Sequence, residues 1–170
     1  MYPVCIMDTT TVEQATLLDL PQLTDLLHEL FTMEAEMESD FQPNRAKQMR
    51  GLQLILEQPN RGRIFVLRHN GMILGMINLL FTISTAEGGF VALLEDVIVH
   101  REHRRQGIGA KLLKHAIDYA KTKNFLRITL LTDRLNEDSQ HFFKKQGFFT
   151  SSMVPMRLIL APLESAQPAQ

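Results

Sequence analysis

The sequence predicts a mixed α/β fold, in which helices flank a mostly antiparallel central sheet. Three observations indicate this class. Apolar residues recur at helical spacing near the N-terminus, β-branched runs meet at a tight-turn dipeptide in the middle of the chain, and helical and strand patterns alternate after it. The 170 residues are enough for one compact core, so we expect a single domain over 1–170.

The N-terminal part predicts one strand and two helices. Segment 12–18 alternates loosely and is expected to be the first strand. Asp19 and Pro21 are typical of the N-cap and first turn of a helix, and leucines follow at helical spacing. A second helix is expected over 44–57, although Gly51 lies in its middle.

Three strands are expected in the middle of the chain. Segments 63–68 and 72–82 are apolar and are joined through Asn70-Gly71, a dipeptide typical of a tight hairpin. A second turn leads into 90–99, whose nearly continuous apolar run predicts a central strand covered on both faces. Two carboxylates, at positions 95 and 96, interrupt this run.

The C-terminal part alternates between helix and strand. An apolar stripe over 109–122 predicts an amphipathic helix that packs on the sheet. Segment 127–132 is expected to be a strand, 137–146 a short helix, and 156–160 a last strand. The tail 161–170 has little to bury, and we expect it to be disordered.

Composition and charge argue against several classes of function. The 18 basic and 19 acidic residues give a net charge of −1, so no basic excess indicates nucleic acid or an anionic membrane as a partner. No run approaches the ~20 apolar residues of a membrane span, and no secretory signal is visible. Cys5 is the single cysteine, and no Cys/His cluster has zinc-site spacing. We therefore expect a cytoplasmic protein without a resident metal.

The loop between the central strand and the amphipathic helix has the features of an anion-binding turn. Gly107 and Gly109 let the main chain approach a ligand closely, and the free N–H groups of a helix N-terminus bind anions. Arg104 and Arg105 add positive charge. A bare Gly-x-Gly turn is also compatible with an ordinary strand-to-helix connection. The loop is neither a Walker A segment nor a dinucleotide fingerprint.

The wider context resembles the Gcn5-related N-acetyltransferase (GNAT) superfamily. Residues 104–109 match its coenzyme A signature, Arg/Gln-x-x-Gly-x-Gly/Ala. Residues 95–99 are similar to its pantetheine-binding strand, and 136–148 are similar to its second conserved block, in which an Asn starts a helix that ends in Gly-Phe. The clear match covers 93–148. It implies the single-domain fold of that superfamily, with two splayed central strands.

The resemblance also implies acetyl-coenzyme A as the acetyl donor. Backbone groups of Val97 and Val99 would pair with pantetheine amides, N–H groups from Arg105 to Ala110 would hold the pyrophosphate, and Asn136 would lie near the pantetheine arm or simply cap its helix. The candidate cofactor-binding residues are Val97, Ile98, Val99, Arg104, Arg105, Gln106, Gly107, Ile108, Gly109, Ala110, Asn136 and Phe143.

The candidate catalytic residues are Glu95, Asp96 and Asn136. Transfer to an amine requires removal of a proton, because a free alkyl ammonium has a pKa of about 10. A carboxylate in an apolar strand has a raised pKa and can accept that proton directly or through water. Strand alternation places the two carboxylates on opposite faces unless a bulge re-aims one. We favour Glu95 as the base, and Asp96 is as easily a structural cap or ion-pair partner.

Phe143 stands where many members of the superfamily carry a Tyr that is thought to protonate the departing thiolate. A phenyl ring donates no proton. His141 is a conceivable substitute, and water can also protonate a thiolate whose unperturbed pKa is about 8.5 by analogy with cysteine. The sequence therefore leaves the source of the thiol proton open.

The leading hypothesis is direct acetyl transfer to the primary amine of a small molecule, such as a polyamine, an amino acid or an aminoglycoside-like compound. Two alternatives stay open. One is acetylation of a protein N-terminus or lysine, and the other is a coenzyme A-binding sensor that has lost catalysis. The sequence does not name the acceptor, and a homodimer is compatible with it.

Overall fold

The computed structural model describes residues 10–35 and 43–160. They fall into two compact units, which divide between residues 131 and 132. The single domain expected over 1–170 therefore stays a prediction. Cys5 and the tail 161–170, with its expected disorder, lie outside the described residues.

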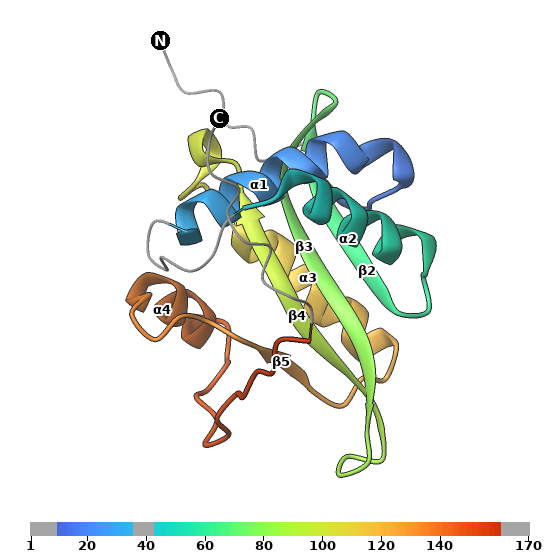
Figure 1. The fold of residues 1–170 in the computed structure, drawn as a ribbon, viewed down its shortest axis with the longest axis vertical. Coiled ribbons are helices and arrows are strands. Elements are labelled where there is room, and N and C mark those ends of the chain that lie inside the picture. Colours follow the sequence, from blue (N-terminus) through green and yellow to red (C-terminus); the bar gives the residue numbers. More distant parts are fainter. Residues whose placement is uncertain (1–9, 36–42, 161–170) are drawn as a thin grey trace. The chain divides into compact units, whose positions relative to one another are not determined.

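The first unit is built on a five-stranded sheet with the order β1-β2-β3-β4-β5 (Figure 1). The strands β1 to β4 pair antiparallel, whereas β5 runs parallel to β4. This mixed sheet confirms the predicted fold class. The strands are Val12–Gln14 (β1), Gly62–His69 (β2), Met72–Ser84 (β3), Gly89–Val99 (β4) and Ile128–Leu130 (β5).

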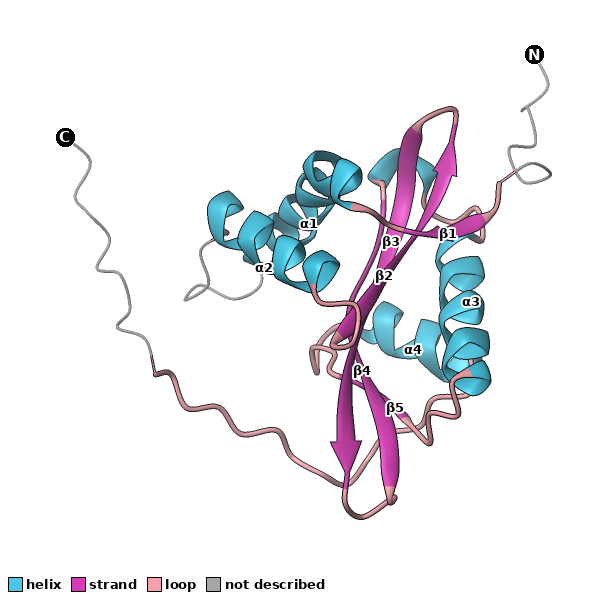
Figure 2. Ribbon diagram, turned by 90° about the vertical axis from the view of Figure 1, so that its right-hand side faces the viewer, coloured by secondary structure: helices cyan, strands magenta, loops and turns pink. Residues whose placement is uncertain are grey.

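The helices of this unit cover both faces of the sheet. Figure 2 shows α1 (Leu20–Ala35) and α2 (Arg45–Glu57) on one face and α3 (Ile108–Thr122) on the other. Side chains alternate between these layers along β2. Ile64 packs into the buried cluster with leucines of α1 and α2, whereas the ring of Phe65 contacts Tyr119 of α3. None of the helices in the described part of the chain is long and apolar enough to cross a bilayer.

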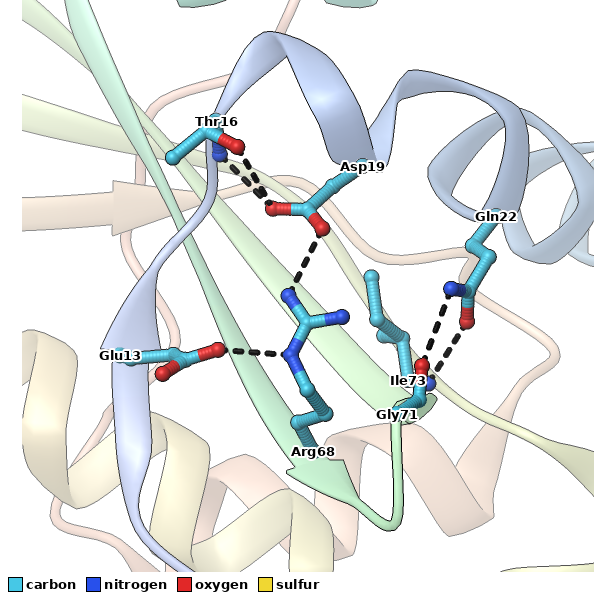
Figure 3. Close-up of polar contacts among 7 residues, drawn as sticks. All are labelled: Glu13, Thr16, Asp19, Gln22, Arg68, Gly71 and Ile73. Carbon is cyan, nitrogen blue, oxygen red and sulfur yellow. Dashed lines mark hydrogen bonds and ion pairs between the residues drawn. The ribbon is translucent and has the colours of Figure 1, made fainter.

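The β2–β3 hairpin forms where the dipeptide predicts it. Asn70 and Gly71 both have positive φ, 49° and 79°, as a two-residue hairpin turn requires. Gln22 of α1 holds this turn with both ends of its amide. Its Nε2 donates to the carbonyl of Gly71 at 3.1 Å, and its Oε1 accepts from the N–H of Ile73 at 2.8 Å (Figure 3).

The N-terminal strand and helix start differ from the prediction. The strand expected over 12–18 ends at Gln14, and the 3-10 turn Leu17–Asp19 follows it. Thr16, rather than Asp19, is the N-cap of that turn. The carboxylate of Asp19 accepts from the N–H of Thr16 at 2.8 Å and from Arg68 at 2.7 Å. Asp19 is thus buried in a polar cluster of its own, which periodicity along the chain does not reveal.

The pairing of β4 changes along its length. Residues 92–94 pair with 128–130 of β5, and β4 then continues to Val99. No described strand pairs with the β5 side of 95–99. The strands β4 and β5 thus share only a short ladder, which agrees with the splayed strands that the resemblance implies.

The second unit contains one helix, α4 (Glu137–Lys145), among its described residues. The last strand predicted over 156–160 is wrong, because the structure assigns no strand there. A strand needs a hydrogen-bonding neighbour and a face to bury. The apolar side chains of this segment are exposed instead, and they are Met156, Leu158, Ile159 and Leu160.

Candidate active site

A β-bulge at Glu95 aims two neighbouring carboxylates at one pocket. Asp96 lies opposite Asn78 of β3, and Leu94 lies opposite Leu79, so Glu95 is the extra residue on β4. Glu95 and Asp96 both line the same pocket, which regular strand alternation would not allow. Sequence analysis left open which carboxylate faces the cleft, and the bulge brings both to it.

The pocket lies between α1 and α2 on one side and β3 and β4 on the other, and its volume is about 340 Å³. This volume is near the lower end of the range for small-molecule sites. Apolar residues and Gly51 make up half of the residues that line it. The polar and charged lining residues are Asn44, Lys47, Gln48, Asn78, Glu95 and Asp96.

Asp96 and Glu95 differ in their surroundings. Asp96 is buried, with 8% of the residue exposed. Its Oδ2 accepts a hydrogen bond from Nδ2 of Asn78 at 3.0 Å. Burial raises the pKa of Asp96 to about 6; the hydrogen bond from Asn78 opposes this rise, and the charge of Glu95 adds to it. Glu95 is exposed. Burial therefore makes Asp96 a stronger base than an ordinary Asp.

Two buried amide atoms in this pocket wall have no hydrogen-bond partner among the described residues. They are Oδ1 of Asn78 and Nε2 of Gln48. The other end of each amide is engaged, since Asn78 donates to Asp96 and Oε1 of Gln48 lies 3.0 Å from Nδ1 of His28. Leaving a buried polar atom unpaired costs about 1–3 kcal/mol. Such atoms are therefore candidates for contact with a ligand.

The loop after β4 has the backbone of an anion site. It contains the 3-10 turn Arg101–His103, and Arg105 has a φ of 60°. Gly107 is the N-cap of α3 with a φ of 79°, and it offers no side chain to the helix N-terminus. The first N–H groups of α3, from Ile108 onward, therefore lie at the positive end of the helix dipole without a side-chain cap.

Arg104 connects this loop to two other elements. Its Nε donates to the carbonyl of Val99 at the end of β4 (2.9 Å), and its Nη2 pairs with Oε1 of Glu29 on α1 (2.8 Å). The guanidinium is thus engaged with protein groups. Its contact with a phosphate stays a prediction, as do the cofactor contacts of Gln106, Gly109 and Ala110.

The remaining predicted cofactor residues lie in different surroundings. Ile98 of β4 is buried in the core cluster, and Val97 and Val99 flank it and are half-buried. Asn136 and Phe143 belong to the second unit. Oδ1 of Asn136 accepts from the N–H of Ser139 at 3.0 Å, so the side chain caps α4 as one of its two expected roles requires. Phe143 contacts the rings of Phe142 and Phe148.

The two amides of the pocket were not among the residues predicted from the sequence. Asn78 had a visible signal, because it is a single amide in the apolar run of β3. Gln48 had none, since it lies on a helix with many polar residues and its position in the pocket depends on packing. Among the described residues, no group of three or more His, Cys, Asp or Glu side chains could hold a metal ion.

The sequence of the chain matches a known protein family. The chain matches the sequence model of the Acetyltransferase (GNAT) family over residues 20–148. It therefore belongs to this family. Streptothricin acetyltransferase A from Bacillus subtilis (strain 168) is 35% identical over 65 residues, which are 38% of this chain and 38% of that relative. The chain thus matches well under two thirds of that relative's length.

Solved structures share the fold at low identity. An aminoglycoside acetyltransferase, meta-AAC0020, from an uncultured soil metagenomic sample in complex with sisomicin has a TM-score of 0.73 at 23% identity, covering 92% of this chain and 99% of its own. Ribosomal-protein-alanine N-acetyltransferase from Brucella melitensis biovar Abortus 2308 has a TM-score of 0.67 at 16% identity, covering 89% and 99%. At this identity the likeness shows the fold alone.

Proposed function

We propose that the protein transfers an acetyl group from acetyl-coenzyme A directly to the primary amine of a small molecule. One observation carries this proposal. Glu95 and Asp96 line the pocket and follow the point where the pairing of β4 with β5 stops. A cofactor arm along the open edge of 95–99 and an amine in the pocket would meet beside these carboxylates.

Asp96 would accept the proton of the amine, and Glu95 would attract the cationic form. A base with a pKa of about 6 is ionised at neutral pH and is more basic than an ordinary Asp. The ammonium gives up two protons overall. One leaves through the carboxylate to solvent, and the other ends on the thiol after the C–N bond forms and the C–S bond breaks. Glu95 as the base, which the sequence favoured, is the alternative.

The coenzyme would lie along the open edge of β4 and on the loop after it. We assign the pyrophosphate to the N–H groups of residues 105–110, because the start of α3 offers uncapped donors. Val97 and Val99 would pair with the pantetheine amides. The cofactor contacts of Asn136 and Phe143, which the resemblance implies, stay predictions. Acetyl-coenzyme A supplies the activated thioester carbonyl when it is bound.

The small size of the pocket supports a metabolite-sized acceptor over a protein, and so does the partial similarity to a streptothricin acetyltransferase. The competing proposals are a protein amine as the acceptor and a coenzyme A sensor without turnover. We place the enzyme in the cytoplasm, where thiols stay reduced and the single Cys5 needs no partner.

The proposal is tested by measuring thiol release from acetyl-coenzyme A. The acceptors are polyamines, amino acids, aminoglycosides and peptides with free N-termini. We expect release with at least one small amine and little release with the peptides. Binding of acetyl-coenzyme A without release for any amine would favour the sensor, and release with the peptides alone would favour a protein acceptor.

A further inference from the structure

The acceptor pocket has two chemically different ends. The end formed by the sheet offers hydrogen-bond acceptors, which are the carboxylates of Glu95 and Asp96 and the unpartnered Oδ1 of Asn78. The other end includes the N-cap and first turn of α2, where Asn44, Lys47 and Gln48 line the pocket. Lys47 offers only donors, and the helix N-terminus adds a partial positive charge.

Gln48 presents an unused donor at this second end. The residue is 7% exposed, and its Oε1 lies 3.0 Å from Nδ1 of His28, which leaves Nε2 without a partner among the described residues. A buried N–H group without a partner is satisfied when a ligand brings an oxygen to it. This end of the pocket is therefore complementary to an oxygen rather than to a second ammonium group.

The charges of the pocket favour a neutral oxygen over a carboxylate oxygen on the acceptor. Two carboxylates and one lysine line it, so its formal charge is negative when all three are ionised. A carboxylate on the acceptor would add a third negative charge to a small, partly desolvated space. A hydroxyl, ether or carbonyl oxygen accepts the hydrogen bond of Gln48 without this repulsion.

We infer that the acceptor is a primary amine that also carries a neutral oxygen, and that Gln48 selects this oxygen while the carboxylates of the sheet bind the amine. The inference rests on the proposed function, because it concerns the acceptor of that same site. It narrows the candidates to amino alcohols and amino sugars. Polyamines and free amino acids are disfavoured.

A matched series of acceptors tests this inference. Alkylamines of three to six carbons carry the primary amine at one end and a methyl, hydroxyl, ammonium or carboxylate group at the other. We expect kcat/KM to be highest for an amino alcohol at one chain length, by about tenfold over the other members of that length, as one buried hydrogen bond supplies. Equal or better turnover of the diamine at every length would overturn the inference but leave the proposed function standing.

Variants of Gln48 test whether this residue causes the preference for an amino alcohol. Gln48→Leu should lower kcat/KM for the amino alcohol about tenfold more than it lowers kcat/KM for the simple alkylamine. Gln48→Glu keeps the size of the side chain and should move the preference toward the diamine. Gln53→Leu is the matched control, because Gln53 lies on α2 but bonds to Glu57 outside the pocket.

The outcomes separate the two proposals. An unchanged preference in both Gln48 variants would overturn the role of Gln48 and with it the inference. Absence of thiol release with every amine would instead overturn the proposed function, on which the inference depends. A loss of preference in Gln53→Leu equal to that in Gln48→Leu would show a general effect of α2 and would also contradict the inference.

Discussion

The two faces of the same sheet are built in different ways. On the face toward α3, the side chains interlock as aromatic pairs, with Phe65 against Tyr119 at 5.0 Å and Phe81 against Phe125 at 4.9 Å. On the face toward α1 and α2, the buried side chains of Asn78 and Asp96 lie beside a pocket. Both faces bury apolar side chains that stabilise the fold, but the second face also holds unpaired polar atoms that a ligand can use.

The largest effect is expected on the pocket face, in the rate. Asp96→Asn keeps an acceptor for Asn78 but removes the base, so kcat/KM should fall about 10²- to 10⁴-fold. In the unmodified protein the rate should fall as the pH drops below about 6, because the base is then protonated. Rate measurements from pH 5 to 9 check this, and the acid limb should be absent from the variant.

Glu95→Gln is the matched control for this experiment. It should reduce the rate less and shift the acid limb to lower pH, because the charge of Glu95 contributes to the raised pKa of Asp96. If Glu95→Gln abolishes the acid limb and Asp96→Asn retains it, Glu95 is the base, as the sequence favoured.

The largest effect on stability is expected on the opposite face. Phe65 is 3% exposed and its ring packs against His115 and Tyr119 of α3. Phe65→Ala should lower the free energy of unfolding by about 3–5 kcal/mol, as other buried phenylalanines do. Denaturant unfolding measures this. A loss below about 1 kcal/mol would contradict the stabilising role given to this face.

On the pocket face, by contrast, the buried carboxylate of Asp96 should lower the stability of the folded protein when it is ionised. Burial raises the pKa of Asp96 from 3.8 to about 6, so the folded state binds the proton more tightly than the unfolded state. The contribution of Asp96 to stability therefore decreases as the pH rises from about 4 to about 6. Its ionisation costs about 3 kcal/mol at pH 7.5. Unfolding of Asp96→Asn should lack this pH dependence and show no loss of stability at pH 7.5.

The smallest effect is expected in the cofactor loop, where a substitution should weaken binding of acetyl-coenzyme A. Gly107 and Gly71 share a φ of 79° but lie in different turns. A leucine at either position strains the backbone similarly. Only Gly107→Leu should weaken binding of acetyl-coenzyme A, by tenfold or more, in a direct titration. Equal affinities in the Gly107→Leu and Gly71→Leu variants would contradict the placement of the pyrophosphate.

Most elements of the fold could be predicted because their signals are local. Apolar periodicity placed α3, and the hairpin followed from Asn70-Gly71, whose backbone must take positive φ. The wrong predictions involve distant partners. Asp19 resembles a helix cap along the sequence, but its carboxylate pairs with Arg68 on the distant strand β2. Segment 156–160 has apolar residues without a described strand to pair with.

The candidate site was predictable only in part for the same reason. The carboxylates and the glycine loop are visible in the sequence, since they interrupt apolar or helical patterns. The bulge at Glu95 is a property of the pairing between two strands, and the unpaired donor of Gln48 is a property of how α1 and α2 pack. Neither has a signature within its own segment.

Because Glu95 is the extra residue of the bulge, it can be present or absent without changing which side chains of β4 face the core. Leu93 lies opposite Leu80 of the pocket wall, and Ile98 belongs to the core on that same face. A strand lacking residue 95 would keep regular alternation from Leu93 through Asp96 to Ile98. A single codon inserted into an ordinary strand is thus enough to add an acid to this site, without any change in the residues that the core buries.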